Sequence, residues 1–203
     1  VTPDLVMVKV TLKVNAPEYT PQGVDLTVPG TKNGWKTGAW KMTRGGAVTN
    51  DYEYTFEAQE GEVITYKYVK NSSWDQEGLA DHTPANTNDD DVSYYGYGAT
   101  GTDLSFVVTN QGGNKMTVQD KIVRWIDMPV VITSHTDGQT VSSDSITLKG
   151  TAIKEGVMTI NGQPVAINDD MTFSHTVNLA PGENKLNIHI EPSEENKSTI
   201  FKN

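Results

Sequence analysis

The stretch from Val8 to Val14 reads VKVTLKV, so four apolar side chains alternate with three polar ones. This period of two is typical of a β-strand with one buried face. The same alternation returns in Val24–Val28, Tyr52–Phe56 and Ile64–Tyr68. No segment of helical length combines a capping residue with apolar positions spaced three and four apart. The sequence therefore predicts an all-β protein.

A change of pattern near Asp127-Met128-Pro129 divides the chain. Ile122–Ile126 has the pattern of a last strand, and Val130–Ile132 opens a new series of short strands with turn residues between them. Within Val157–Ile167, Asn161-Gly162 predicts a β-hairpin, because a type I′ turn needs positive φ at both central positions. We expect two β-sandwich domains in tandem, at residues 1–128 and 129–203, the second a small immunoglobulin-like sandwich.

Aromatic residues separate the two halves. All four Trp and all eight Tyr precede residue 128, and Phe173 and Phe201 are the aromatic residues that follow it. Aromatic side chains beyond the needs of a core often form a binding surface. The other interpretation, a tyrosine-rich core in the first domain, stays open at this point.

Charge and composition exclude several classes of function. The formal net charge of -10 disfavours binding to nucleic acid and to anionic membranes. No apolar run reaches the roughly 18 residues of a membrane span, so membrane insertion is not expected. The chain has no cysteine, which excludes thiol catalysis and Cys-ligated zinc. A neutral polymer such as a polysaccharide fits this charge balance.

Three places combine an aromatic ring with hydrogen-bonding groups, as a sugar site requires. Trp35 ends the loop Gly30–Trp35, which is rich in turn-forming residues. Lys67 lies between Tyr66 and Tyr68, so in a strand it points away from both tyrosines. Ser72–Asp75 presents Trp74 at the start of a long polar loop. A flat ring stacks on the apolar face of a sugar, while nearby polar groups bind its hydroxyls.

Taken in order, these motifs resemble the starch-binding domains of glucoamylases, cyclodextrin glucanotransferases and amylopullulanases, which form carbohydrate-binding module family twenty. The resemblance covers residues 5–128 and is most specific at Tyr66-Lys67-Tyr68 and Trp74-Asp75. It implies an antiparallel sandwich in which Trp35 and Trp74 stack on adjacent glucose units and Lys67 binds their hydroxyls. Asp75 matches the acidic residue that follows the family's tryptophan, and Asn86 is the nearest candidate for the family's asparagine.

The same resemblance implies a second site and leaves other residues open. Tyr19 matches a tyrosine of the family's second site, and Tyr52 stands where the family has a tryptophan. Trp40 has two interpretations, a member of the binding platform or a core residue at the start of a strand. Trp125, in the last strand of the domain, is expected to be buried.

The loop after Trp74 departs from the family, because it continues to about residue 98 and no arginine accompanies Asn86. Loops this long are uncommon without a function. Tyr94, Tyr95 and Tyr97 therefore have two interpretations: they extend the sugar site, or they form a hairpin packed on the sandwich. Residues Asp89–Asp91 are a calcium candidate because Ca²⁺ prefers oxygen ligands, although a merely hydrated acidic loop is the simpler interpretation.

The chain is not expected to be an enzyme. Glycoside hydrolysis needs two carboxylates facing each other across the scissile bond, and the acidic residues here fall on predicted strand faces and loops. We expect no cofactor and no metal centre other than that calcium candidate. The second half resembles bacterial immunoglobulin-like modules found beside amylolytic domains, which act as spacers.

The expected function is non-catalytic binding of starch, glycogen or maltooligosaccharides. We expect the chain to be a monomeric fragment or mature product of a larger multidomain bacterial protein, secreted or at the cell surface. A structural or adhesion module with a protein partner is the alternative.

Overall fold

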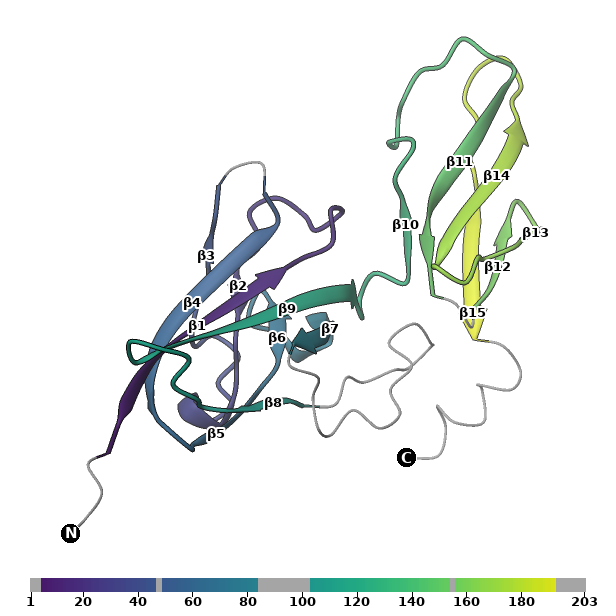
Figure 1. Cartoon of the computed structure of the whole chain (residues 1–203). Coiled ribbons are helices and arrows are strands. Elements are labelled where there is room, and N and C mark those ends of the chain that lie inside the picture. The colour runs from purple at the N-terminus through teal and green to yellow at the C-terminus, as the bar shows by residue number, and fades with distance from the viewer. Residues whose placement is uncertain (1–4, 47–48, 84–102, 154–155, 193–203) are drawn as a thin grey trace. The chain divides into compact units, whose positions relative to one another are not determined.

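The fold is given by a computed structural model that describes residues 5–46, 49–83, 103–153 and 156–192. In these residues every regular element is a β-strand or a 3₁₀ helix of three residues, which confirms the all-β class. None of the described helices is long and apolar enough to cross a membrane. The described residues divide into two compact units, here called unit 1, which comprises those up to Asp127, and unit 2, which comprises those from Met128 onward (Figure 1).

Unit 1 contains a seven-stranded sheet in the order β2-β6-β7-β9-β1-β4-β3. β1 pairs in parallel with β9 and antiparallel with β4, and Figure 1 shows these three strands side by side. The strands of this sheet are β1 (Met7–Asn15), β2 (Leu26–Thr27), β3 (Thr43–Arg44), β4 (Asp51–Gln59), β6 (Tyr68–Lys70), β7 (Glu77–Thr83) and β9 (Lys115–Trp125).

A second sheet covers the inner face of this large one. It consists of β5 (Val63–Tyr66) and β8 (Leu104–Val107), paired antiparallel. Ile64, Leu104 and Phe106 point inward and are at most 4% exposed. The Tyr66 hydroxyl reaches across and donates a 2.6 Å hydrogen bond to Asp120 of β9. The two sheets therefore share one core, as in a β-sandwich.

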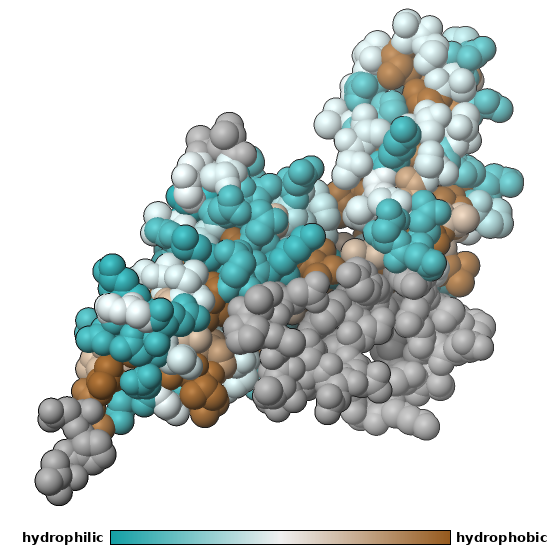
Figure 2. All heavy atoms as spheres, viewed as in Figure 1, coloured by the Kyte–Doolittle hydropathy of each residue, from teal (hydrophilic) through white to brown (hydrophobic). Residues whose placement is uncertain are grey.

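The alternation that predicts β1 holds residue by residue. Its even-numbered residues from Val8 to Val14 are at most 1% exposed, while Lys9 and Lys13 face outward. The outward face continues across β4 with Glu53 and Glu57. Figure 2 shows this side of unit 1 as largely hydrophilic.

Unit 2 is a smaller sandwich of two three-stranded sheets, β10-β11-β14 and β13-β12-β15. Leu148 and Phe173 from the first sheet pack with Met158 and Ile160 from the second in one apolar core. The strands are β10 (Val130–Ile132), β11 (Ser145–Ala152), β12 (Gly156–Ile160), β13 (Gln163–Val165), β14 (Thr172–Asn178) and β15 (Ile188–Pro192).

The hairpin at Asn161-Gly162 forms as the sequence predicts. Ile160 pairs with Gln163, and the two turn residues have φ values of 51° and 78°. Both values lie in the left-handed region that a type I′ turn needs.

Two expected strands differ in the structure. The alternation in Ile64–Tyr68 is not one strand, because β5 ends at Tyr66 in one sheet and β6 begins at Tyr68 in the other. Lys67 lies at this crossing, where its backbone N–H donates to the Pro29 carbonyl. The expected strand Val24–Val28 is reduced to Leu26–Thr27.

Candidate functional site

The rings of Trp35 and Trp74 lie together although 38 residues separate them in the sequence. Their centroids are 6.4 Å apart and their planes are inclined by 41°. Trp74 is 42% exposed and Trp35 is half-buried, so both rings keep surface open to solvent. We call this pair the tryptophan platform.

The loop that carries Trp35 is closed by the side chain of Asn33. Its Oδ1 accepts a 2.9 Å hydrogen bond from the Gly30 N–H, and its Nδ2 donates at 2.8 Å to the Val28 carbonyl. The Trp35 N–H in turn donates to the Gly30 carbonyl across the 3₁₀ helix η1 (Thr31–Asn33). These bonds fix the backbone from which the ring projects.

The backbone around η1 is strained and closely packed. Trp35 itself has φ 61°, a conformation that is uncommon for a bulky side chain and often marks a functional position. A Cβ added at Gly30 would lie 2.5 Å from the Thr65 carbonyl oxygen, so only glycine lets η1 approach β5 this closely.

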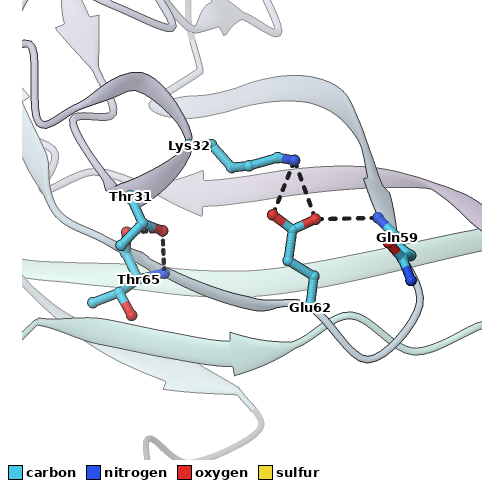
Figure 3. A network of polar contacts seen from close by, with 5 residues as sticks. All are labelled: Thr31, Lys32, Gln59, Glu62 and Thr65. Atoms are coloured by element: carbon cyan, nitrogen blue, oxygen red, sulfur yellow. Dashed lines mark hydrogen bonds and ion pairs between the residues drawn. The ribbon is translucent and has the colours of Figure 1, made fainter.

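A polar network fastens η1 to β5 and to the turn before it (Figure 3). The Lys32 ammonium lies 3.0 Å from Oε1 of Glu62, and that carboxylate also accepts from the Gln59 N–H. On the other side of η1, the Thr65 N–H donates to Oγ1 of Thr31 at 3.2 Å. The loop with Trp35 is therefore held from both sides.

The loop that carries Trp74 is fixed in a similar way. Asn71 donates its N–H to the Asp25 carbonyl at 2.7 Å, and its side chain donates to Gln76 at 3.1 Å. This turn leads into the 3₁₀ helix η2 (Trp74–Gln76), whose first residue is the tryptophan itself. Asp75 follows it and is exposed.

Lys67 lies between the segments that carry the two tryptophans. Its backbone bonds to Pro29 at the start of the Trp35 loop, and its Nζ lies 2.9 Å from Oε1 of Glu77, the residue after η2. Nζ is also 3.7 Å from Oδ1 of Asp103. Burial raises the pKa of the Glu77 carboxyl above its usual value, and the hydrogen bond and charge of Lys67 partly offset that rise.

The predicted second-site residues are less accessible than the platform. Tyr19 is half-buried, and burial raises the pKa of its hydroxyl, which also bonds to the backbone of Trp125. Tyr52 lies on the inner face of β4 and is 5% exposed. Its remaining surface lines a hollow of about 300 Å³ with Lys13 and Gln119.

Trp40 stacks on two residues of β4, with centroid distances of 4.3 Å to Phe56 and 5.1 Å to Tyr54. All three rings are half-buried. Trp125 is fully buried, as expected, and its Nε1 donates to Thr20 at 2.9 Å.

Several predicted residues lie outside the described part of the chain. These are Asn86, the calcium candidates Asp89, Asp90 and Asp91, and Tyr94, Tyr95 and Tyr97. Within the described residues, no three His, Asp or Glu side chains gather as metal ligands would.

Two acidic residues were not predicted from the sequence. Glu77 is 7% exposed beside Lys67, and Asp120 is 2% exposed and accepts 2.6 Å hydrogen bonds from both Tyr66 and Tyr68. A signal was present for Asp120, because it takes an inward position in the alternating pattern of Lys115–Trp125. Asp120 holds the two tyrosines that flank Lys67.

The chain is similar to parts of known proteins. Residues 129–202 match the family model described as glucodextranase, domain B. The chain is 33% identical over 197 residues to an amylopullulanase of Thermoanaerobacterium thermosulfurigenes, covering 96% of this chain and 10% of that protein. It is also 33% identical to an amylopullulanase of Thermoanaerobacter thermohydrosulfuricus, covering 99% of this chain and 13% of that one.

Among solved structures, a glycoside hydrolase family 15 glucoamylase from Hypocrea jecorina matches with a TM-score of 0.41 and 15% identity, over 59% of this chain and 17% of that one. The chain spans about a tenth of the length of the curated relatives it matches. It is thus similar, along nearly its whole length, to one segment of two amylopullulanases.

Proposed function

We propose that this chain binds starch or a related α-glucan without cleaving it, through the tryptophan platform and Lys67. Residues 1–128 act as the binding module, and residues 129–203 act as an immunoglobulin-like spacer. The chain serves as an accessory part of a larger amylolytic enzyme that is secreted or held at the cell surface. Binding raises the concentration of the parent protein on its polymer, which is a tethering effect.

The observation that carries the proposal is the arrangement of Trp35 and Trp74. Two rings 6.4 Å apart can each stack on one sugar of a chain, and their 41° inclination suits a chain that bends between adjacent units. An α-1,4-glucan bends in this way, whereas a β-1,4-glucan is nearly flat. The geometry thus favours starch over cellulose.

Polar groups beside the platform support the same function. Lys67 can donate hydrogen bonds to hydroxyls, and the exposed carboxylate of Asp75 can accept them. Such groups fix the position of a sugar that the rings hold mainly by its apolar face.

Three observations support the proposal that residues 1–128 bind the glucan and residues 129–203 act as a spacer. Two relatives are amylopullulanases, and the part of the chain that matches glucodextranase domain B contains no Trp or Tyr. The boundary between the two compact units falls between Asp127 and Met128, close to the proposed limit of the binding module.

A retention experiment on insoluble polysaccharides tests the proposal. We expect the whole chain to bind starch, to be released by maltoheptaose, and to pass through cellulose and xylan. Trp35→Ala and Trp74→Ala should each weaken binding by roughly 1–3 kcal/mol, in the range of aromatic truncations at other binding sites. Val63→Ala, at a residue of unit 1 that is 56% exposed, is the matched control and should bind like the wild type.

Unchanged retention of both tryptophan variants would refute the assignment of the platform. Failure of the wild-type chain to bind any α-glucan would instead favour the protein-binding alternative. Calorimetric titration with maltoheptaose gives the same answer in solution, and release of sugar from starch would show that the chain is a hydrolase.

A further inference from the structure

Each tryptophan of the platform adjoins a tight turn. Residues 36–39, here called turn A, directly follow Trp35, and a backbone hydrogen bond of 3.0 Å from the last residue to the first closes this turn. Within turn A, the Thr37 carbonyl also accepts a hydrogen bond from the hydroxyl of Thr27. Thr27 belongs to β2 and is 1% exposed, so turn A is fastened to a buried residue of the large sheet.

Turn B, residues 70–73, directly precedes Trp74 and is closed by the same kind of backbone bond at 3.1 Å. It begins at Lys70, a buried residue of β6 whose Nζ lies 2.9 Å from Oδ2 of Asp127. β2 and β6 are paired in the large sheet, with Leu26 opposite Lys70. The pairing of β2 with β6 therefore brings the anchors of both turns together.

The two turns meet at Gly38 of turn A and Ser72 of turn B. A Cβ added at Gly38 would lie 3.4 Å from Oγ and 3.9 Å from Cβ of Ser72. The backbone of turn A thus passes beside this serine with room for little more than a methyl group between them. Because a ring projects from the residue next to each turn, the distance between the turns bears on the distance between the rings.

Backbone strain is concentrated in the same two segments. Seven non-glycine residues in the described part of the chain have positive φ, and four of them lie in or next to the turns: Trp35, Trp40, Asn71 and Ser72. Positive φ costs free energy in a residue with a side chain, and such strain often persists where a function needs one particular geometry.

Contact and strain together point to one role. We propose that Gly38 and Ser72 are positioning residues of the glucan site, whose contact sets the separation and inclination of the tryptophan rings and persists when the glucan binds. The inference rests on the proposed glucan binding, and it adds two residues that act through the position of the rings. A platform that is formed before the sugar arrives lowers the entropic cost of binding.

A pair of introduced thiols can set the distance between the turns. The chain has no cysteine, and the 3.9 Å between the two Cβ positions lies in the range of a disulfide. Gly38 does not have positive φ, so its backbone accepts a side chain. Oxidation of the double variant Gly38→Cys with Ser72→Cys should therefore hold the turns in contact. Reaction of the reduced thiols with α,α′-dibromo-p-xylene instead inserts a rigid ring that keeps the two sulfurs apart.

Calorimetric titration with maltoheptaose compares the reduced, disulfide and xylylene-bridged forms of this double variant. The disulfide form should bind at least as tightly as the reduced form, because the bond locks a contact that is already present. The xylylene-bridged form should bind roughly tenfold more weakly, as for the loss of one aromatic contact at a binding site.

A second thiol pair in unit 1 is the matched control. A Cβ added at Gly45 would lie 4.0 Å from Cβ of Asp51, so Gly45→Cys with Asp51→Cys can form the same disulfide and take the same bridge. Neither treatment of this pair should change the affinity for maltoheptaose. Benzyl bromide on the single variants Gly38→Cys and Ser72→Cys adds the bulk of a ring without joining the turns, and these forms should bind like the reduced double variant.

Two results would overturn the inference. Weaker binding by the disulfide form than by the reduced form would mean that the turns have to separate for the glucan to enter. Equal binding by the disulfide and xylylene-bridged forms would mean that the distance between the turns does not matter. Scanning calorimetry checks that each form is folded. If the bridged form does not fold, the comparison of the disulfide and reduced forms decides.

The same titrations separate this inference from the function on which it rests. If the wild type binds maltoheptaose, Trp74→Ala binds more weakly, and all three forms of the double variant bind alike, the inference about Gly38 and Ser72 alone is wrong. If the wild type does not bind maltoheptaose, the proposed function is wrong and the inference fails with it.

Discussion

Units 1 and 2 are both two-sheet sandwiches, but they fill their cores with different side chains. The largest buried residues of unit 1 are Trp125, Tyr66 and Tyr68, whose polar atoms all find buried partners. The described core of unit 2 is built from aliphatic residues and Met158, with Phe173 as its one aromatic side chain. A two-sheet sandwich can therefore form a core with buried Trp and Tyr side chains or without them.

The difference shows which aromatic residues the fold does not need. Unit 2 demonstrates that a sandwich of this kind packs without Trp or Tyr. In unit 1 the buried aromatics pack with aliphatic residues in the core, whereas Trp35 and Trp74 keep surface open to solvent and lie on loops. Exposed aromatic side chains that packing does not require are typical of a binding surface.

The largest loss of stability is expected from a substitution in unit 2 that should leave binding by unit 1 unchanged. Gly150 of β11 packs directly against the Val131 carbonyl, and an added Cβ would collide with it. Gly150→Ala should lower the stability of unit 2 by about 3 kcal/mol, as for severe overpacking. Starch binding should not change while unit 1 is folded.

Tryptophan fluorescence reports on unit 1 alone, because all four Trp precede residue 128. Circular dichroism of the backbone would follow both units of the Gly150 variant. A loss of starch binding in that variant would mean that unit 2 contributes to the site.

Alkaline pH should destabilise unit 1 but not unit 2, and this effect should be almost as large as that of Gly150→Ala. Burial and the charge of Asp120 raise the pKa of Tyr66 and Tyr68 well above 10.0. The contribution of these tyrosines to the free energy of unfolding is complete below pH 10. It is lost as the pH rises further, because their hydroxyls ionise at a lower pH in the unfolded chain than in the fold. The loss is about 1.4 kcal/mol per tyrosine for each pH unit above 10.

Denaturant titration at pH 8, 10 and 11 measures this loss. Unit 2, which has no tyrosine, should show none of it, and Tyr66→Phe with Tyr68→Phe should flatten the profile of unit 1. An equal loss of stability in both units would contradict the assignment.

Two asparagines give a matched pair with a smaller effect. Asn33 in unit 1 and Asn184 in unit 2 each use both ends of the side-chain amide to close a loop. Replacing either with Ala should cost its unit about 1 kcal/mol of stability. Only Asn33→Ala should also weaken maltoheptaose binding, because only that loop carries a platform residue. Calorimetry on both variants checks this. Equal maltoheptaose affinities would mean that binding does not depend on the hydrogen bonds of Asn33.

The smallest effect is expected at the ion pair in Figure 3. Lys32 and Glu62 are 30% and 32% exposed, so solvent screens their attraction. Glu62→Gln should change the stability of unit 1 by less than about 0.5 kcal/mol, as for other surface pairs. A much larger loss in a thermal unfolding experiment would show that this network, and not Asn33, is what holds η1.

The sequence predicts those parts of the fold that depend on local pattern. β1, β4 and the hairpin at Asn161-Gly162 form as expected, because alternation and turn residues act over a few positions. The division between β5 and β6 was missed. Alternation continues unbroken through Ile64–Tyr68, and the change of sheet is set by distant partners such as Pro29.

The sequence likewise predicts some residues of the candidate site and misses others. Loop residues and the family resemblance single out Trp35, Trp74 and Lys67, and the structure brings the two tryptophans together. The Glu77 partner was not predicted, because it depends on the register between β6 and β7. The second site at Tyr19 and Tyr52 stays a prediction.

The position of β9 has a consequence for how the chain is made. β9 is the last strand of unit 1 in the sequence, yet it lies in the middle of the large sheet, between β1 and β7. During synthesis β1 therefore emerges about a hundred residues before its parallel partner, and until then the edges of β1 and β7 are open to other strands. Unit 1 can complete this sheet only after Trp125 has left the ribosome, and the long separation between β1 and β9 raises the contact order, which slows folding.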